Sequence, residues 1–258
     1  MTEILLADFL LVLLIFIRLF AMMMAAPVLS NAAFPMLARI FIAFVVAYLT
    51  FLTIDKSHIV IDANLVSLIF SGTKEFITGY IMGFALSFIF NGISFAGHLI
   101  GYDMGLMMAE VMDPTQETSN NVIGEVIFYA STILFIVING HHHLITAVVS
   151  SFKLVPVAKY TINKPVVDLI INYAFGVFII AIKIAAPIMV SFLLIHIAEG
   201  IIAKVIPQIQ IFFVTQPLKI GLGFIFLIGL APLFVFAIKS FLNGYELQLS
   251  ELIKSMGA

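Results

Sequence analysis

The sequence predicts an all-α integral membrane protein of about six long, kinked helices arranged in hairpins. Of its 258 residues, 63% are hydrophobic and 10% are charged, and the mean hydropathy is +1.21. A soluble domain carries about 25% charged residues. The apolar runs are nearly continuous, whereas the strands of a membrane barrel would alternate apolar and polar residues. Helical spans are therefore expected.

Composition also argues against several classes of protein. The net charge of −2 argues against a nucleic-acid surface. With no cysteine, the chain has no disulfide framework, no thiolate nucleophile and no cysteine zinc site. The N-terminus carries Glu3 and Asp8 where a secretory signal would carry lysine or arginine, so no cleaved leader is expected.

Six apolar segments are long enough to account for the predicted spans. A helical span needs roughly 20 apolar residues at about 1.5 Å each. The third and fifth segments are long enough to be bent or paired. The segments lie at about 4–29, 36–54, 65–102, 122–149, 166–202 and 209–239.

Charged side chains interrupt several of these segments. A charge at a bilayer centre costs at least ~2.5–3.5 kcal/mol, so such residues usually face protein or water. For Arg18, Arg39 and Lys219 we expect the simpler arrangement, in which a side chain near a segment end reaches the interface. Lys183 and His196 lie deeper, and for Lys183 an interfacial and a protein-facing position stay equally open.

Prolines predict where the helices turn or bend. Pro27 and Pro35 bracket a turn between the first two segments. Pro187 lies inside an apolar run and predicts a kink. Pro207 and Pro217 bracket a second break.

The C-terminal stretch 241–258 has an amphipathic pattern. Two interpretations stay open, a helix on the membrane surface and a docking helix for another subunit. The apolar face consists of Leu242, Tyr245, Leu249, Leu252, Ile253 and Met256.

Small residues at helical spacing predict close contacts between helices. Gly97, Gly101 and Gly105 form a GxxxGxxxG pattern on one face of a helix, where a neighbouring backbone can approach. A second ladder of small residues lies in the third segment, at Gly79, Gly83 and Ser87.

A methionine stripe follows the glycine pattern. Met104, Met108 and Met112 recur every four residues, and Met107 lies three residues after Met104. Pro114 then turns the preceding Asp113 away from helical geometry, and residues 113–121, DPTQETSNN, are mostly polar. Methionine often only fills a core, but a flexible thioether also seals a pore and repacks around passing chains. The polar stretch 113–121 beside the methionine stripe favours the interpretation that the stripe seals a pore.

Histidines and carboxylates give little support to catalysis. His141, His142 and His143 are consecutive, so on a helix they point about 100° apart and cannot converge on one metal. Asp103, Glu110 and Asp113 lack a partner histidine at suitable spacing, and Glu110 is interpreted as a residue at the mouth of a water-filled lumen. The sequence also lacks a GxSxG or GxxxxGK motif. We expect no enzyme activity, cofactor or metal.

Five motifs along the chain carry a resemblance to a known family. They are APVLS (26–30), FPMLARI (34–40), GHLIGYDMGLMMAEVMDP (97–114), NGHHHLI (139–145) and PQIQIFFVTQPLKIGLG (207–223). In their order and spacing the chain resembles the FliR family of flagellar and type III secretion export-gate membrane proteins. Residues 184–219 also look like the hairpin of the small partner subunit FliQ. This resemblance implies a FliP-like part at 1–165 with a central plug loop, and a FliQ-like hairpin with a C-terminal amphipathic helix at 166–258.

The resemblance implies a subunit of the flagellar type III export gate in the bacterial inner membrane, at the basal body. Its partners would be FliP-like and FliQ-like subunits, FlhB-like and FlhA-like components, and unfolded flagellar proteins that cross through the channel. The loop at about 106–121 would plug the closed pore. The expected pore residues are Met104, Leu106, Met107, Met108, Glu110, Met112, Asp113 and Pro114.

Two other functions remain as alternatives. A self-contained polytopic transporter would use Glu110 and Lys183 as a buried charge pair, and would require inverted repeats, which the sequence does not show. An intramembrane metalloenzyme would use His141–His143 and would bind stoichiometric metal.

Overall fold

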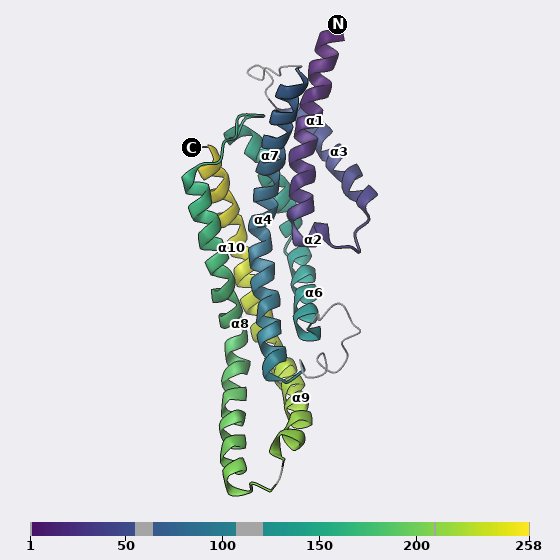
Figure 1. Ribbon diagram of the computed structural model, residues 1–258. Coiled ribbons are helices and arrows are strands. Elements are labelled where there is room, and N and C mark those ends of the chain that lie inside the picture. Colours follow the sequence, from purple (N-terminus) through teal and green to yellow (C-terminus); the bar gives the residue numbers. More distant parts are fainter. Residues whose placement is uncertain (1, 55–63, 107–120, 209, 258) are drawn as a thin grey trace. The chain divides into compact units, whose positions relative to one another are not determined.

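The computed structural model describes residues 2–54, 64–106, 121–208 and 210–257 (Figure 1). Helices joined by turns make up this part of the chain, and it contains no strand, so the all-α prediction is confirmed. The helices are α1 (Thr2–Ala25), α2 (Pro27–Ser30), α3 (Met36–Thr53), α4 (Leu65–Asp103), α6 (Val122–Val137), α7 (Gly140–Leu154), α8 (Lys164–Val205), α9 (Ile211–Gly229) and α10 (Ala231–Gly257).

Helices α1, α3, α4 and α8 are each long and apolar enough to cross a membrane. The pairs α6–α7 and α9–α10 are bent by 67° and 61°, and if each pair is one span the described residues contain six, the number that the hydropathy predicts. The two longest predicted segments are single helices, α4 with 39 residues and α8 with 42. At 1.5 Å per residue they measure roughly 60 Å, about twice the thickness of a hydrocarbon core. Much of each helix must therefore lie outside the bilayer or against protein.

The observed breaks follow only some of the prolines. Asn139 lies between α6 and α7 with φ +59°, a left-handed conformation that asparagine tolerates. Pro27 is the first residue of α2, where its missing N–H costs nothing. Pro217 was expected to mark a break, but it lies inside α9; α8 ends at Val205, shortly before Pro207, and α9 begins at Ile211. Helix α8 continues through Pro187.

The chain forms two compact units. Unit 1 contains Met1–Phe88, Asn139–Ala174 and Gly244–Ala258, and unit 2 contains Ile89–Ile138 and Phe175–Asn243. Helices α4, α8 and α10 contribute residues to both. The predicted boundary between a FliP-like part and a FliQ-like part lies after residue 165, and this division stays a prediction.

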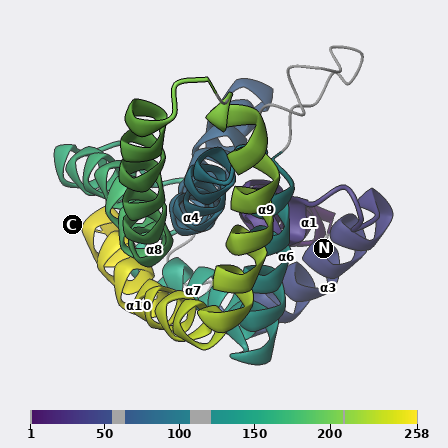
Figure 2. The same ribbon diagram turned by 90° about the horizontal axis from the view of Figure 1, so that it is seen from below.

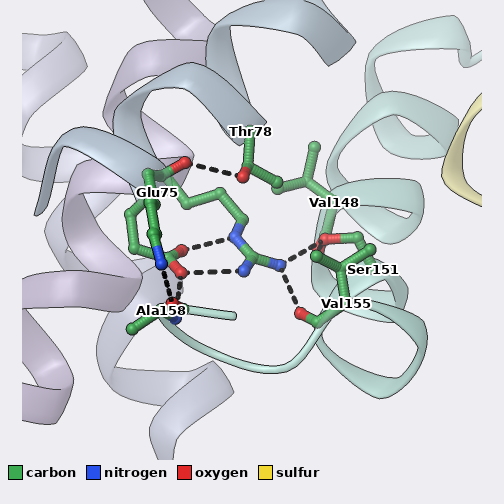
Figure 3. A network of polar contacts seen from close by, with 8 residues as sticks. Glu75, Thr78, Val148, Ser151, Val155 and Ala158 are labelled. Atoms are coloured by element: carbon green, nitrogen blue, oxygen red, sulfur yellow. Dashed lines mark hydrogen bonds and ion pairs between the residues drawn. The ribbon is translucent and has the colours of Figure 1, made fainter. Parts of the chain in front are cut away.

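A fully buried ion pair lies at the centre of unit 1 (Figure 3). Arg18 of α1 donates from Nε and Nη2 to the carboxylate of Glu75 of α4, at 2.6 and 3.0 Å. Its Nη1 donates to Ser151 Oγ and Val155 O at 3.0 and 3.1 Å, and the guanidinium lies 4.0 Å from the centre of the Phe152 ring. The side chains of Arg18 and Glu75 are both 0% exposed. The prediction that Arg18 reaches the interface is therefore wrong.

The same carboxylate fixes the turn that follows α7. Glu75 Oε1 accepts a hydrogen bond from the backbone N–H of Ala158 at 2.7 Å, and Lys74 Nζ donates to the Ala158 carbonyl at 3.3 Å. Ala158 has φ +63°, a left-handed conformation that a residue with a side chain adopts only when its surroundings hold it there. The network therefore joins α1, α4, α7 and this turn.

Glycines explain how α1 and α4 approach closely enough to enclose that pair. A Cβ added at Gly79 would overlap the Arg18 carbonyl, and one at Gly83 would overlap the Met22 carbonyl. Ser87, one turn further on, is buried. The two glycines of the predicted small-residue ladder are therefore confirmed as points of contact with the backbone of α1.

The amphipathic C-terminal stretch is packed against the rest of the chain, and from Gly244 onward it belongs to unit 1. The six residues of its apolar face are at most 5% exposed. Tyr173 Oη donates to the Gln248 carbonyl at 2.9 Å, and Asn163 Nδ2 donates to the Ser255 carbonyl at 2.7 Å. Neither a membrane-surface helix nor a free docking helix describes this face, because the chain itself covers it.

Candidate functional site

The end of α4 lies against the start of α6 in unit 2. A Cβ added at Gly97 would lie 2.5 Å from Gly124 Cα, and one at Gly101 would overlap the Asn121 side chain. Two rungs of the predicted glycine pattern thus allow the direct contact between helices that their spacing predicts.

Asn121 holds the first turn of α6 and fastens it to α4. Its Oδ1 accepts hydrogen bonds from the backbone N–H groups of Ile123 and Gly124, at 2.9 and 3.4 Å. Its Nδ2 donates to the His98 carbonyl of α4 at 3.3 Å. Asn121 is only 2% exposed, so one buried side chain serves both as the N-cap of α6 and as a bridge between the helices.

Helix α4 stops just before the methionine stripe. Leu106 N–H donates to the Gly101 carbonyl at 3.0 Å, and Gly105 N–H donates to the Tyr102 carbonyl at 2.9 Å. This pair of bonds is the Schellman motif, with Gly105 in the left-handed conformation at φ +80°. The third glycine is therefore the terminator of α4. Helix α4 ends at Asp103, and the methionines of the expected stripe after Met104 lie outside the described residues.

Helix α9 contacts this helix end with one of its faces. Gln216 Nε2 donates to the Gly105 carbonyl at 3.0 Å. Two turns later Gly223 makes room for Met104, which is 0% exposed, and a Cβ at 223 would lie 2.5 Å from Met104 Cγ. In Figure 2 the end of α4 lies between α8 and α9.

Lys219 lies on the same face of α9, between Gln216 and Gly223. Its Nζ is 2.7 Å from Glu199 Oε2 of α8, and its side chain is 9% exposed. Lys219 was expected to reach the interface, but it is buried and ion-paired because an acceptor from the neighbouring helix meets it there.

Comparison with known proteins identifies the family. Residues 9–244 match the family described as bacterial export proteins, family 1. The flagellar biosynthetic protein FliR of Bacillus subtilis (strain 168) is 32% identical over 220 residues, which cover 84% of each chain. The chain belongs to the FliR family. The FliR proteins of Escherichia coli (strain K12) and Aquifex aeolicus (strain VF5) are each 24% identical, over 84% and 88% of this chain and over 82% and 87% of their own lengths.

The pore residues expected for this FliR-family chain are only partly described. Met107, Met108, Glu110, Met112, Asp113 and Pro114 lie outside the described residues. Met104 is buried against α9, and Leu106 is half-buried directly after the Schellman turn. Both Leu106 N–H and the Asn121 side chain lie against Gly101, so the two described residues that flank the segment 107–120 lie close together.

Asp103 is the only member of the expected carboxylate cluster in the described part of this FliR-family chain. It lies in the last turn of α4 and lines a groove of about 360 Å³. The other lining residues come from α8 and include His196. The histidine cluster lies in unit 1, where His143 Nε2 is 3.0 Å from Glu246 Oε1 and the rings of His141 and His142 are 4.2 Å apart.

Sequence reasoning missed Asn121 and Gln216 in this FliR-family protein. Asn121 directly precedes the apolar run of α6, which is a recognisable N-cap position. Gln216, Lys219 and Gly223 follow one another at intervals of three and four residues in an otherwise apolar helix, which places them on one face. No local signal identifies Gly105 as the partner of Gln216, because the two are 111 residues apart.

Proposed function

We propose that this FliR-family protein is a non-catalytic subunit of the flagellar protein export gate in the bacterial inner membrane. It forms part of the channel through which unfolded flagellar axial proteins cross. Membership of an export family supports this proposal, as do the four to six candidate spans in the described part of the chain. The observation that carries it is the convergence of Leu106 and Asn121, the two residues that flank the segment 107–120, at Gly101.

The proposed division of labour follows from this arrangement. The end of α4 and the start of α6 form a base held by glycine contacts and a buried cap. The segment between them carries Met107, Met108 and Met112, whose flexible side chains suit a seal that must open for chains of different sequence. Met104 is assigned to the base, since its side chain is buried against α9. The energy for transport comes from partners, because the sequence has no nucleotide-binding motif.

Other membrane subunits are the proposed neighbours. FliP-like and FliQ-like chains complete the channel, and FlhB-like and FlhA-like components act with it at the basal body. Only 22% of the apolar stretch of α3 and 33% of that of α8 are buried within this chain. These two helices therefore leave large apolar surfaces for lipid or for neighbouring subunits.

Deletion of Thr115–Asn120 tests the gate function. The deletion keeps Asn121, so the cap of α6 and its bond to α4 are retained. Inner-membrane vesicles with the assembled complex should leak protons faster than wild type, as measured by collapse of an imposed pH gradient. An unchanged leak in a complex that still assembles would remove the gate role from this segment.

Co-purification tests the larger claim. The gate requires stable association with other small membrane subunits, whereas the transporter and metalloenzyme alternatives require none. The described structure favours neither alternative: Lys183 is exposed instead of buried, and His143 is paired with Glu246. Full transport activity in a purified monomer would refute the proposal.

A further inference from the structure

The side chain of Gln216 joins two helices whose connection the proposed function does not itself explain. Gln216 belongs to α9, and the carbonyl that it binds belongs to Gly105, the terminating residue of α4. The Schellman motif uses the Gly101 and Tyr102 carbonyls and does not use that of Gly105. Gln216 supplies a donor for the Gly105 carbonyl from another helix.

The fit between the two residues is specific. A Cβ added at Gly105 would overlap the amide of Gln216, so glycine is required here for space as well as for its φ of +80°. A shorter side chain at 216 would not reach the carbonyl, and a carboxylate would have no proton to donate to it. Shape and donor character together therefore select glutamine.

The face of α9 that carries Gln216 is also fixed to α8. Lys219, one turn further on, forms the buried pair with Glu199, and Gly223 accommodates Met104. A displacement of α9 would therefore act on the end of α4 through two contacts, one polar and one apolar.

We propose that Gln216 is a positioning residue for the gate, which fixes the point where the chain leaves α4 and couples it to α9. The inference rests on the proposed function, since it gives the helix end a role in closing the channel. Loss of the Gln216 bond frees the Gly105 carbonyl and loosens the base of the segment, so the closed state leaks.

The absence of cysteine allows a direct measurement of this position. In the double variant M104C/G223C the two Cβ atoms come within about 4 Å, because Met104 Cγ is one bond of about 1.5 Å from its Cβ. A Cβ at 223 lies 2.5 Å from that Cγ. This separation is in the range of disulfides, about 3.5–4.5 Å. The rate of disulfide formation in vesicles with the assembled complex then reports whether the end of α4 stays against α9.

Gln216→Ala should lower this cross-linking rate roughly fivefold, the population change expected for one hydrogen bond. In the chain without introduced cysteines it should raise the proton leak. Gln208→Ala replaces an exposed glutamine before α9 and is the matched control, expected to change neither quantity. Wild-type cross-linking and leak in Gln216→Ala would overturn the inference.

Gln216→Glu separates donor character from packing, because the two side chains have nearly the same shape. The ionised variant should behave like Gln216→Ala, and acidification should restore cross-linking as the carboxyl group gains a proton to donate. At each pH the cross-linking rate is divided by that of the M104C/G223C chain that keeps Gln216. This ratio cancels the effect of other groups that titrate near the end of α4, which are the introduced thiols, Asp103, His196, Glu199 and Lys219. A Gln216→Glu variant that is impaired at neutral pH and does not recover in acid would overturn the hydrogen-bond role.

The two proposals fail in different ways. If deletion of Thr115–Asn120 raises the leak and Gln216→Ala changes neither measurement, only the role of Gln216 is refuted. If the deletion leaves the leak unchanged, the gate function is refuted, and with it the role of Gln216 in closing the channel. The cross-linking rate then shows separately whether Gln216 holds the helix end.

Discussion

Removing the negative partner of the buried pair in unit 1 should destabilise the protein severely. In Glu75→Gln the amide keeps nearly the shape of the carboxylate and an acceptor for the Ala158 N–H, but Arg18 is left as an uncompensated charge at 0% exposure. Breaking a buried pair in this way costs about 3–5 kcal/mol. The equilibrium between unfolded and folded protein should shift roughly 200- to 5,000-fold.

A double variant distinguishes electrostatics from a general packing defect. Arg18→Met in the Glu75→Gln background removes both charges, and replacing a buried pair by neutral groups of similar volume is often close to neutral. The double variant should therefore be more stable than Glu75→Gln alone. Lys183→Met, which removes an exposed cation, is the control and should change stability by no more than about 0.5 kcal/mol.

The assay is denaturation of the purified protein in mixed detergent micelles with increasing dodecyl sulfate, followed by loss of helical circular dichroism. A double variant that is less stable than Glu75→Gln would refute the charge-pair reasoning. A Glu75→Gln variant whose free energy of unfolding lies within about 0.5 kcal/mol of that of wild type would refute it as well.

Three further substitutions test the base of the proposed gate. Gly97→Val should prevent close contact between α4 and α6 and lower the yield of folded protein, whereas Gly200→Val, where an added Cβ meets nothing within 4 Å, should leave the yield unchanged. Asn121→Ala should cost about 1 kcal/mol in the same dodecyl sulfate titration, since α6 loses its cap. Lys219→Met should lower stability less than Glu75→Gln does, because the Glu199 side chain left behind is 19% exposed and keeps some contact with water. An equal loss of stability in Lys219→Met and Glu75→Gln would contradict this explanation.

The glycine spacings predicted the close-packing face of a helix correctly, because that face depends on the helix alone and not on which element packs against it. Gly79, Gly83, Gly97 and Gly101 all lie where another element comes too close for a side chain. Gly105 has the same spacing but a different role, because the helix ends two residues before it. Periodicity is meaningful only while the helix continues, and that end depends on bonds formed in the folded chain.

The positions of the charged residues could not be predicted from single segments. Arg18 and Lys219 look like interfacial side chains when each is considered within its own segment. Their partners, Glu75 and Glu199, are 57 and 20 residues away in the chain, and each charge is buried only because the partner helix brings a carboxylate to it.

The sequence by itself determined that this chain is a helical membrane protein, where its apolar helices lie and which of their faces carry small residues. These properties depend on hydropathy and spacing, which each segment carries alone. Only the tertiary structure decided that α4 ends at Asp103, that Gln216 holds that end, and that the C-terminal helix face is covered by the chain itself. Each of these depends on a contact between residues far apart in sequence, and such contacts exist only after the helices have packed.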